Sequence, residues 1–260
     1  MMQKKIGVKK VLAVVFSFLV LFSVLMVAFD VFSENSQRLI VLRVDDVQDF
    51  AFREGQLFLL NWSQESSLPL SLGVIAGMFG EDIEILDAVR SVVAHGTEVG
   101  VHGWKHENLA ELQLWEQMHI LFQAKCRLKE LLNVDPELLV PPGFSFNKDT
   151  ISAMREESYS IISTCVDYHQ PESFSEVRNL PATVEASVLI DGVWKMKSVE
   201  SLLAEVEASF DSYGYTVIVT HPQEFMFNGT FVEGTGASFV SLLDDLSETC
   251  QFTTFEKLNL

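Results

Sequence analysis

Three histidines and two adjacent aspartates stand at spacings that could serve a metal ion and its substrate. Asp45 and Asp46 are neighbours, His102 and His106 are four residues apart, and His221 lies far downstream. Neutral imidazole and carboxylate oxygen are both ligands of zinc and related divalent metals. Two histidines with one carboxylate leave coordination positions open for water and substrate. The pattern therefore predicts a catalytic metal site.

The histidine pair indicates a metal site only when it is considered together with the two aspartates. A four-residue spacing would put His102 and His106 on one face of a helical turn, although two unrelated surface histidines could share that spacing. Neighbours on a strand point to opposite faces, so Asp45 and Asp46 are predicted to take different roles. One would bind the metal, and the other would accept a proton from metal-bound water. The alternative is that both carboxylates cap a following helix.

Short apolar segments alternate with amphipathic ones, and this alternation predicts where the five residues lie in the fold. Strands are predicted over 39–44, 70–76, 97–101, 138–140, 160–165 and 215–220, and helices over 50–61, 82–94, 109–132, 149–157, 199–213 and 238–249. This alternation predicts a parallel sheet, open or closed into a barrel. In such folds reactive groups gather at the carboxyl ends of the strands. The segments 45–46, 102–106, 141–143 and 221–222 all follow predicted strands.

Composition limits the partners. The chain has 260 residues, of which 48% are hydrophobic and 21% charged, so a sizeable core is available. Without residues 1–30, 14 Lys and Arg stand against 35 Asp and Glu, a formal net charge of −21. A body this acidic repels phosphate backbones and anionic membranes, which argues against nucleic-acid binding. No linker interrupts residues 38–260, so 34–260 is predicted to be one catalytic domain.

Residues 1–33 are typical of a membrane anchor or signal segment. Four lysines precede residues 11–29, in which only Ser17 and Ser23 interrupt the apolar run. At ~1.5 Å per residue this run approaches the ~30 Å hydrocarbon core, and the lysines place the N-terminus inside. Residues 31–33 form an imperfect cleavage site, so we favour an anchor with the catalytic domain outside the cytoplasm. Cleavage would instead give a secreted protein.

The cysteines predict no disulfide framework. Cys126, Cys165 and Cys250 allow one bond at most, and their scattered spacing excludes a zinc knuckle.

The sequence resembles the polysaccharide deacetylase superfamily (NodB-homology, carbohydrate esterase family 4), in a divergent branch that opens with R-x-D-D. The matching segments are 43–46, 98–106, 140–143 and 219–222, and their order and separations fit the family over about residues 38–255. The resemblance implies an α/β fold, a distorted (β/α) barrel of about seven parallel strands, preceded here by one N-terminal hydrophobic helix.

The resemblance also implies roles for single residues. Asp46, His102 and His106 would hold a divalent metal, most often zinc, and Asp45 would be the general base. His221 would be the general acid that protonates the departing amine. The backbone N–H of Gly143 would help to stabilise the oxyanion.

Two positions depart from the family pattern. The family commonly has an arginine where this chain has Val140, and we hypothesise that Arg43, on the same strand face as Asp45, replaces it. Asp167 is the nearest candidate for the aspartate that orients the acid histidine. Trp104, Pro142 and Asp167 are the candidate substrate-binding residues, with Trp104 able either to stack on a sugar ring or to pack in the core.

The implied reaction is removal of an acetyl group, in the first place N-acetyl, from an extracellular or envelope glycan. Two alternatives stay open: a non-catalytic glycan-binding or envelope protein with the same fold, and an amidohydrolase for a small non-sugar amide. The presence of both Asp45 and His221 speaks against the first, and a deep closed pocket would favour the second. Membrane contact is expected through the N-terminal helix only, and the sequence indicates no oligomeric state.

Overall fold

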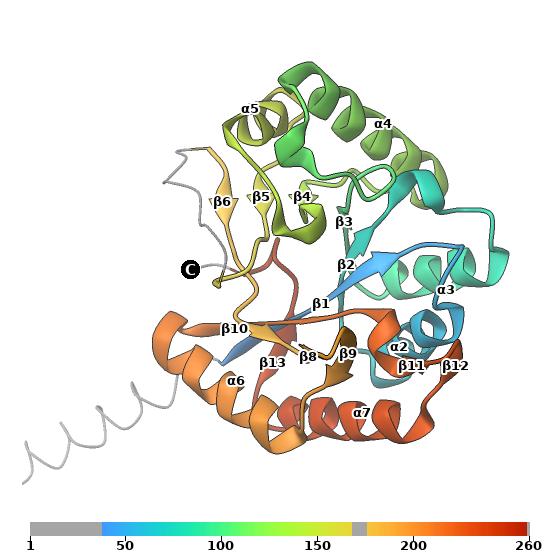
Figure 1. Ribbon diagram of the computed structural model, residues 1–260, viewed down its shortest axis with the longest axis vertical. Helices are drawn as coiled ribbons and strands as arrows, with labels where there is room; N and C mark the ends of the chain where they lie inside the picture. Colours follow the sequence, from blue (N-terminus) through green and yellow to red (C-terminus); the bar gives the residue numbers. More distant parts are fainter. Residues whose placement is uncertain (1–37, 168–175, 259–260) are drawn as a thin grey trace, which may run out of the picture. The chain divides into compact units, whose positions relative to one another are not determined.

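The computed structural model describes residues 38–167 and 176–258, and Arg38–Leu260 form one compact unit (Figure 1). The predicted anchor or signal segment 1–33 lies outside the described residues. Among those that are described, no helix is long and apolar enough to span a bilayer.

A parallel sheet forms the centre of this unit, with helices packed around it (Figure 1). Its strand order is β6-β5-β4-β3-β2-β1-β10-β7, and β13 pairs with the first residues of β1. The strands are β1 (Leu39–Val47), β2 (Ser71–Val74), β3 (Glu98–Val101), β4 (Leu138–Leu139), β5 (Ile161–Ile162), β6 (Arg178–Asn179), β7 (Val184–Glu185), β10 (Tyr215–Thr220) and β13 (Gln251–Thr253). The end strands β6 and β7 are not paired with each other in the described sheet, so the barrel is incomplete. The predicted distorted (β/α) barrel is confirmed, with slightly more strands than expected.

The helices lie close to their predicted positions. They are α2 (Arg53–Ser66), α3 (Ile83–Ala94), α4 (Leu114–Leu132), α5 (Lys148–Glu156), α6 (Val199–Tyr213) and α7 (Glu233–Ser247). The Asp82 carboxylate caps α3 by accepting from the amides of Glu84 and Ile85. The segment 109–132, predicted as one helix, is divided into a 3-10 helix (Leu109–Glu111) and α4. A capping box between Gln113 and Glu116 begins α4.

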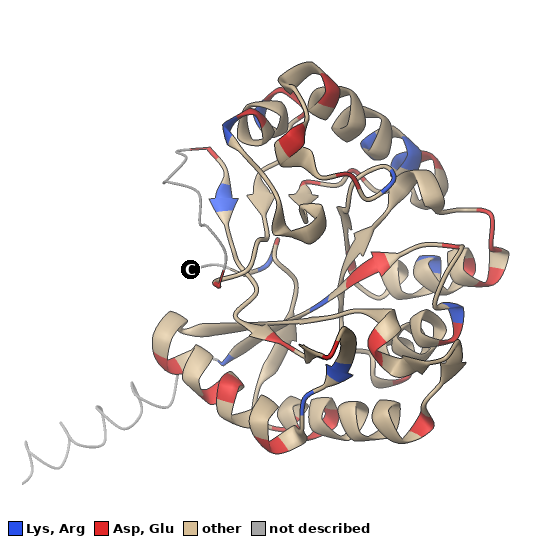
Figure 2. Cartoon of the chain, viewed as in Figure 1, with Lys and Arg blue, Asp and Glu red and all other residues tan. Residues whose placement is uncertain are grey.

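The core is built on β1, whose residues Ile40, Val41 and Leu42 are fully buried. A strand covered on both faces needs apolar residues at successive positions, which explains the unbroken apolar run at its start. The outer helices α6 and α7 carry acidic residues and neither contains a lysine or arginine (Figure 2). The negative charge therefore lies on the outer layer, where water solvates it.

Two small hairpins near the end of the chain were not predicted. They are β8 (Ser187–Ile190) with β9 (Val193–Met196), and β11 (Met226–Phe227) with β12 (Thr230–Phe231). The 3-10 helix η4 (Pro222–Phe225) connects β10 to β11. All three cysteines are free, so the single disulfide that the composition allows is absent.

Candidate active site

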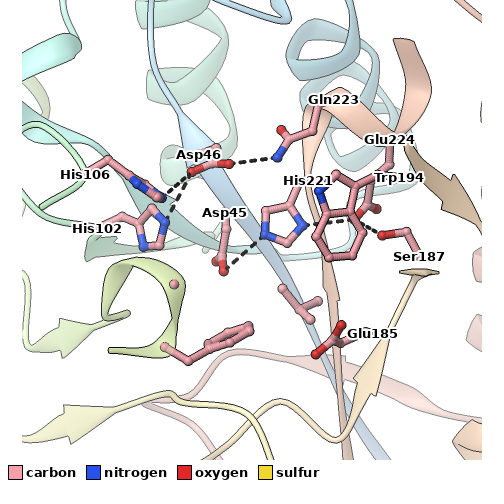
Figure 3. Close-up of a pocket in the computed structure, with 13 residues that line it drawn as sticks. Asp45, Asp46, His102, His106, Glu185, Ser187, Trp194, His221, Gln223 and Glu224 are labelled. Atoms are coloured by element: carbon pink, nitrogen blue, oxygen red, sulfur yellow. Dashed lines mark hydrogen bonds and ion pairs between the residues drawn. The ribbon is translucent and has the colours of Figure 1, made fainter. Parts of the chain in front are cut away.

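A β-bulge in β1 brings both aspartates into one cavity. Val44 pairs with Leu72 and Val47 with Val74, so Asp45 and Asp46 together oppose the single residue Gly73. Asp46 has a left-handed backbone with φ of 59°. The expectation that the two carboxylates point to opposite faces is wrong, because the bulge interrupts the alternation of a regular strand. Both line the same cavity, but they contact different partners (Figure 3).

Asp46 lies against the histidine pair. Its Oδ1 is 3.3 Å from Nε2 of His102 and 3.3 Å from Nε2 of His106. Its Oδ2 accepts a hydrogen bond of 2.9 Å from the side-chain amide of Gln223, a contact that the sequence did not suggest. Burial would raise the pKa of Asp46, but the hydrogen bonds with His102 and His106 hold that pKa well below its ordinary value. The carboxylate is therefore charged at neutral pH.

A loop after β3 brings the two histidines together, rather than the helical turn that was predicted. Residues 102–106 are not helical, and Gly103 and His106 have left-handed φ values of 76° and 65°. These conformations bend the chain so that the imidazole rings meet edge to face, with centroids 4.9 Å apart. The buried His102 has Nδ1 2.8 Å from the carbonyl oxygen of Val140, which leaves its Nε2 directed at Asp46.

Asp46, His102 and His106 have the composition and spacing of a divalent-metal site. Their ligand atoms all lie within 4.8 Å of one another. The Val140 carbonyl fixes the ring of His102, as an outer-shell partner commonly does for a metal-binding histidine. The residues present therefore fit a metal such as zinc, and two nitrogens with one oxygen leave room for further ligands.

Asp45 is paired with a buried arginine. Nη2 of Arg43 is 2.8 Å from Oδ2 of Asp45, and the side chains are 0% and 1% exposed. Nη1 of Arg43 also donates to the hydroxyl and carbonyl of Ser163 and to the carbonyl of Thr164. The contact expected from the shared strand face is therefore present. The hypothesis that Arg43 replaces the arginine which the family commonly has at position 140 stays a prediction. Val140 itself contributes only its backbone carbonyl, which contacts His102.

His221 follows β10 and faces Asp45 across the cavity. Its Nε2 is 3.9 Å from Oδ2 of Asp45, and its Nδ1 is 2.9 Å from Oε1 of Glu224. Glu224 is itself held by hydroxyl donors from Ser187 and Thr220, each at 2.6 Å. Burial lowers the pKa of His221, but the hydrogen bond with Glu224 and the negative charges of Glu224, Asp45 and Asp46 together outweigh this and raise that pKa to about 9. The imidazole therefore carries a proton at neutral pH.

Glu224 corrects the prediction for Asp167. Nδ1 of His221 is already bonded to Glu224, so Asp167 does not orient this histidine. Asp167 instead lies beside Cys165 and Glu185 and lines a neighbouring cavity. Glu224 stands three residues after His221 in the sequence, and this spacing was the signal that could have identified it.

The other predicted residues divide between the cavity and the core. Gly143 lines the cavity with φ of 58°, beside Phe144. Pro142 is buried and is not among the cavity-lining residues. Trp104 packs on the hydrophobic core and against Gly77, so it is not placed to stack on a sugar in this cavity. The tryptophan that lines the cavity is Trp194 of β9 (Figure 3).

The cavity itself has a volume of about 230 Å³. This is below the ~300–1,000 Å³ that is usual for pockets holding a whole small molecule. It can therefore take the reacting end of a ligand, while the remainder lies on the neighbouring surface. Trp194 also lines two adjoining cavities, so the site is not a closed chamber.

Comparison with known families supports the sequence resemblance. The model of the polysaccharide deacetylase family matches residues 33–162, half of the chain. This match includes Asp45, Asp46, His102, His106 and Gly143, and it ends before His221. No curated protein matches the chain.

Solved structures share the fold at low sequence identity. A family 4 acetyl xylan esterase from Clostridium thermocellum is 14% identical with a TM-score of 0.60, over 85% of this chain and 90% of that chain. A peptidoglycan deacetylase from Bacillus subtilis is 17% identical with a TM-score of 0.58, over 86% and 91%. A family 4 pseudoenzyme from Bacillus anthracis is 14% identical with a TM-score of 0.58, over 85% and 65%. The same fold thus carries both active and inactive relatives.

Proposed function

Because the chain belongs to the polysaccharide deacetylase family, we propose that it is a metal-dependent hydrolase that removes acetyl groups from a glycan. The observation that carries this proposal is the grouping of three functions around one cavity: a metal-binding triad, a carboxylate base and a protonated histidine. We further propose that the bond is an N-acetyl amide, since an amine leaving group needs the proton that His221 holds.

Asp46, His102 and His106 would hold the metal, most simply zinc, which would polarise the acetyl carbonyl and lower the pKa of water. Asp45 would accept the proton of the attacking water through its carboxylate, which Arg43 orients. The new carbon–oxygen bond forms as this proton leaves, and the Gly143 amide would donate to the oxyanion. One such donor contributes about 10²–10³-fold to kcat in comparable sites.

His221 would complete the reaction. Its Nε2 faces the cavity while Nδ1 is held by Glu224, so the proton on Nε2 is directed at the substrate. Transfer of this proton to the leaving nitrogen breaks the carbon–nitrogen bond and releases acetate and the free amine of the sugar. A positioned acid of this kind contributes about 10²–10⁴-fold.

The location of the reaction is proposed from residues 1–33. Their lysine-flanked apolar run supports an anchor that leaves the catalytic domain outside the cytoplasm, where envelope or extracellular glycans are the substrates. The body's negative charge favours neutral or cationic glycans over strongly anionic ones.

The test is acetate release from N-acetylated sugar oligomers by the purified full chain supplied with zinc. Asp45→Asn serves as the matched variant, because it removes the base charge and keeps the shape of the side chain. We expect zinc-dependent release from the unmodified chain and a loss of at least about a hundredfold in the variant. Zinc bound at one per chain without acetate release would favour the non-catalytic glycan-binding alternative.

A further inference from the structure

The β8–β9 hairpin carries an unusual amount of exposed apolar surface. The exposed fractions are 41% for Val188, 54% for Leu189, 43% for Ile190, 46% for Val193 and 47% for Trp194. Leu189 pairs with Trp194 on one face of the hairpin, and Ile190 pairs with Val193 on the other. An exposed hairpin normally shows polar side chains on the face that meets water. Exposed apolar side chains gathered in one hairpin are candidates for contact with a ligand or partner.

A cavity of about 360 Å³ lies between β9 and the β11–β12 hairpin. Its apolar lining consists of Val193, Trp194, Met196, Met226, Phe227 and Val232. The polar lining residues are Lys195, Glu224 and Thr235, and Glu224 already bonds His221, Ser187 and Thr220. This wall provides few hydrogen-bonding partners for the hydroxyl groups of another sugar unit.

The apolar cavity adjoins the catalytic one. Trp194 and Glu224 line both cavities, and Figure 3 shows Trp194 beside His221 and Glu224. A ligand whose acetylated sugar occupies the small catalytic cavity would therefore pass over Trp194 into the apolar cavity.

We propose that this apolar cavity is a second subsite, which binds the hydrocarbon chain of an amphiphilic substrate. The inference rests on the proposed deacetylase function and narrows its substrate to acetylated sugars that carry an alkyl or prenyl chain. The exposed Asp191 at the turn of the β8–β9 hairpin makes insertion of that tip into a bilayer costly. The geometry thus fits a chain lying along the hairpin better than a hairpin buried in a membrane.

The test compares the methyl and octyl β-glycosides of N-acetylglucosamine as ligands of the full chain loaded with zinc. Calorimetry gives both dissociation constants, with the octyl glycoside kept below its micelle-forming concentration. Each methylene that leaves water tightens binding by about fourfold. For a chain that is half buried, we expect the octyl glycoside to bind roughly a hundredfold more tightly.

Two phenylalanines provide a matched pair of variants. Phe227 is 62% exposed and lines the cavity, whereas Phe122 is 55% exposed and lies on α4. We expect Phe227→Ser to reduce the octyl-over-methyl ratio about tenfold, and Phe122→Ser to leave that ratio unchanged. Met226→Asp, which puts a charge into the apolar wall, should bring the ratio close to one.

A ratio near one in the unmodified chain would overturn the subsite and assign the apolar surface to a membrane or another protein. Equal losses in Phe227→Ser and Phe122→Ser would overturn it as well. Acetate release from the methyl glycoside tests the proposed hydrolysis separately. An octyl preference without acetate release from either glycoside would support the subsite and contradict the hydrolysis.

Discussion

The two halves of the candidate site differ in how directly the sequence specifies them. The metal-binding half comes from β1, β3 and the segment after β4, and it lies within the residues that the family model matches. The acid half comes from β7, β9, β10 and η4, all beyond residue 162. His221 was predicted in the acid half, but its partner Glu224 and its neighbour Trp194 were not.

The difference teaches that a functional residue is visible in the sequence when it directly follows a recognisable apolar run, as after β1, β3 and β10. In the metal-binding half, each functional segment follows an apolar run bounded by a helix, so spacing alone reveals the strand ends. In the acid half, β7 has two residues and the β8–β9 hairpin is apolar on an exposed surface. β7 is too short to be recognised as a strand. The Asp191-Gly192 turn between β8 and β9 is a hairpin signal in the sequence, although no hairpin was predicted there.

The strongest test of the difference between the two halves is to remove a metal ligand. We expect His102→Ala to lose bound zinc and to lower activity about a thousandfold or more, because it removes a nitrogen ligand and the polarisation that the metal supplies. Zinc content and acetate release measure the two effects. His119→Ala, on the exposed face of α4, is the control. Normal zinc content in His102→Ala would contradict the ligand assignment.

The acid half should lose activity without losing metal. We expect His221→Gln to lower kcat by about 10²–10⁴-fold while zinc stays at one per chain, because the role proposed for His221 is to donate a proton and not to bind the metal. Acetate release and zinc content in the same preparation check this. A parallel loss of zinc would show that the two halves are not separable.

Glu224→Gln should move the pH profile. The pKa of His221 is about 9 because the hydrogen bond and charge of Glu224, together with the charges of Asp45 and Asp46, outweigh burial, so loss of the Glu224 carboxylate lowers that pKa. We expect the alkaline limb of kcat/KM to shift to lower pH by about one unit or more. Glu205→Gln, which removes the partner of Lys197 instead, should leave the limb in place. An unchanged limb in Glu224→Gln would contradict the role of this carboxylate.

The same shift has a consequence for stability. A histidine whose folded pKa is raised stabilises the fold fully below its ordinary pKa of 6.5, and this contribution is lost as the pH rises through about 9. Glu224→Gln should therefore lower the melting temperature more near pH 6.5 than near pH 9. Thermal unfolding at several pH values measures this difference.

The smallest expected effect comes from the residue opposite the bulge. A Cβ on Gly73 would lie 2.9 Å from Oδ1 of Asp45, so Gly73→Ala must displace the carboxylate slightly. We expect kcat to fall about tenfold with zinc retained, because small misplacements of a catalytic group are costly. Gly234→Ala, whose Cβ would meet nothing within 4 Å, is the control. Equal activities would show that the base tolerates this displacement.

The sequence predicted which residues gather, but not by what geometry. Strand–helix alternation was sufficient for a parallel sheet whose strands bring their carboxyl ends to one edge, and the family resemblance implied the distorted barrel. The His102–His106 loop was not predicted, because a four-residue histidine spacing also fits a helical turn, and Gly103 and His106 tolerate left-handed backbone without requiring it. The pairing of His221 with Glu224 rather than Asp167 depends on η4, a four-residue helix too short to show a period.

The bulge in β1 also matters for anyone who aligns or redesigns this chain. An alignment that pairs Leu39–Val47 with β2 as a regular strand would be out of step by one residue after Val44. A redesign that kept the residue types but idealised the backbone would turn one carboxylate out of the cavity. The extra residue therefore sets the register of β1 against β2. The left-handed φ of Asp46 favours aspartate or asparagine over most other side chains at this position.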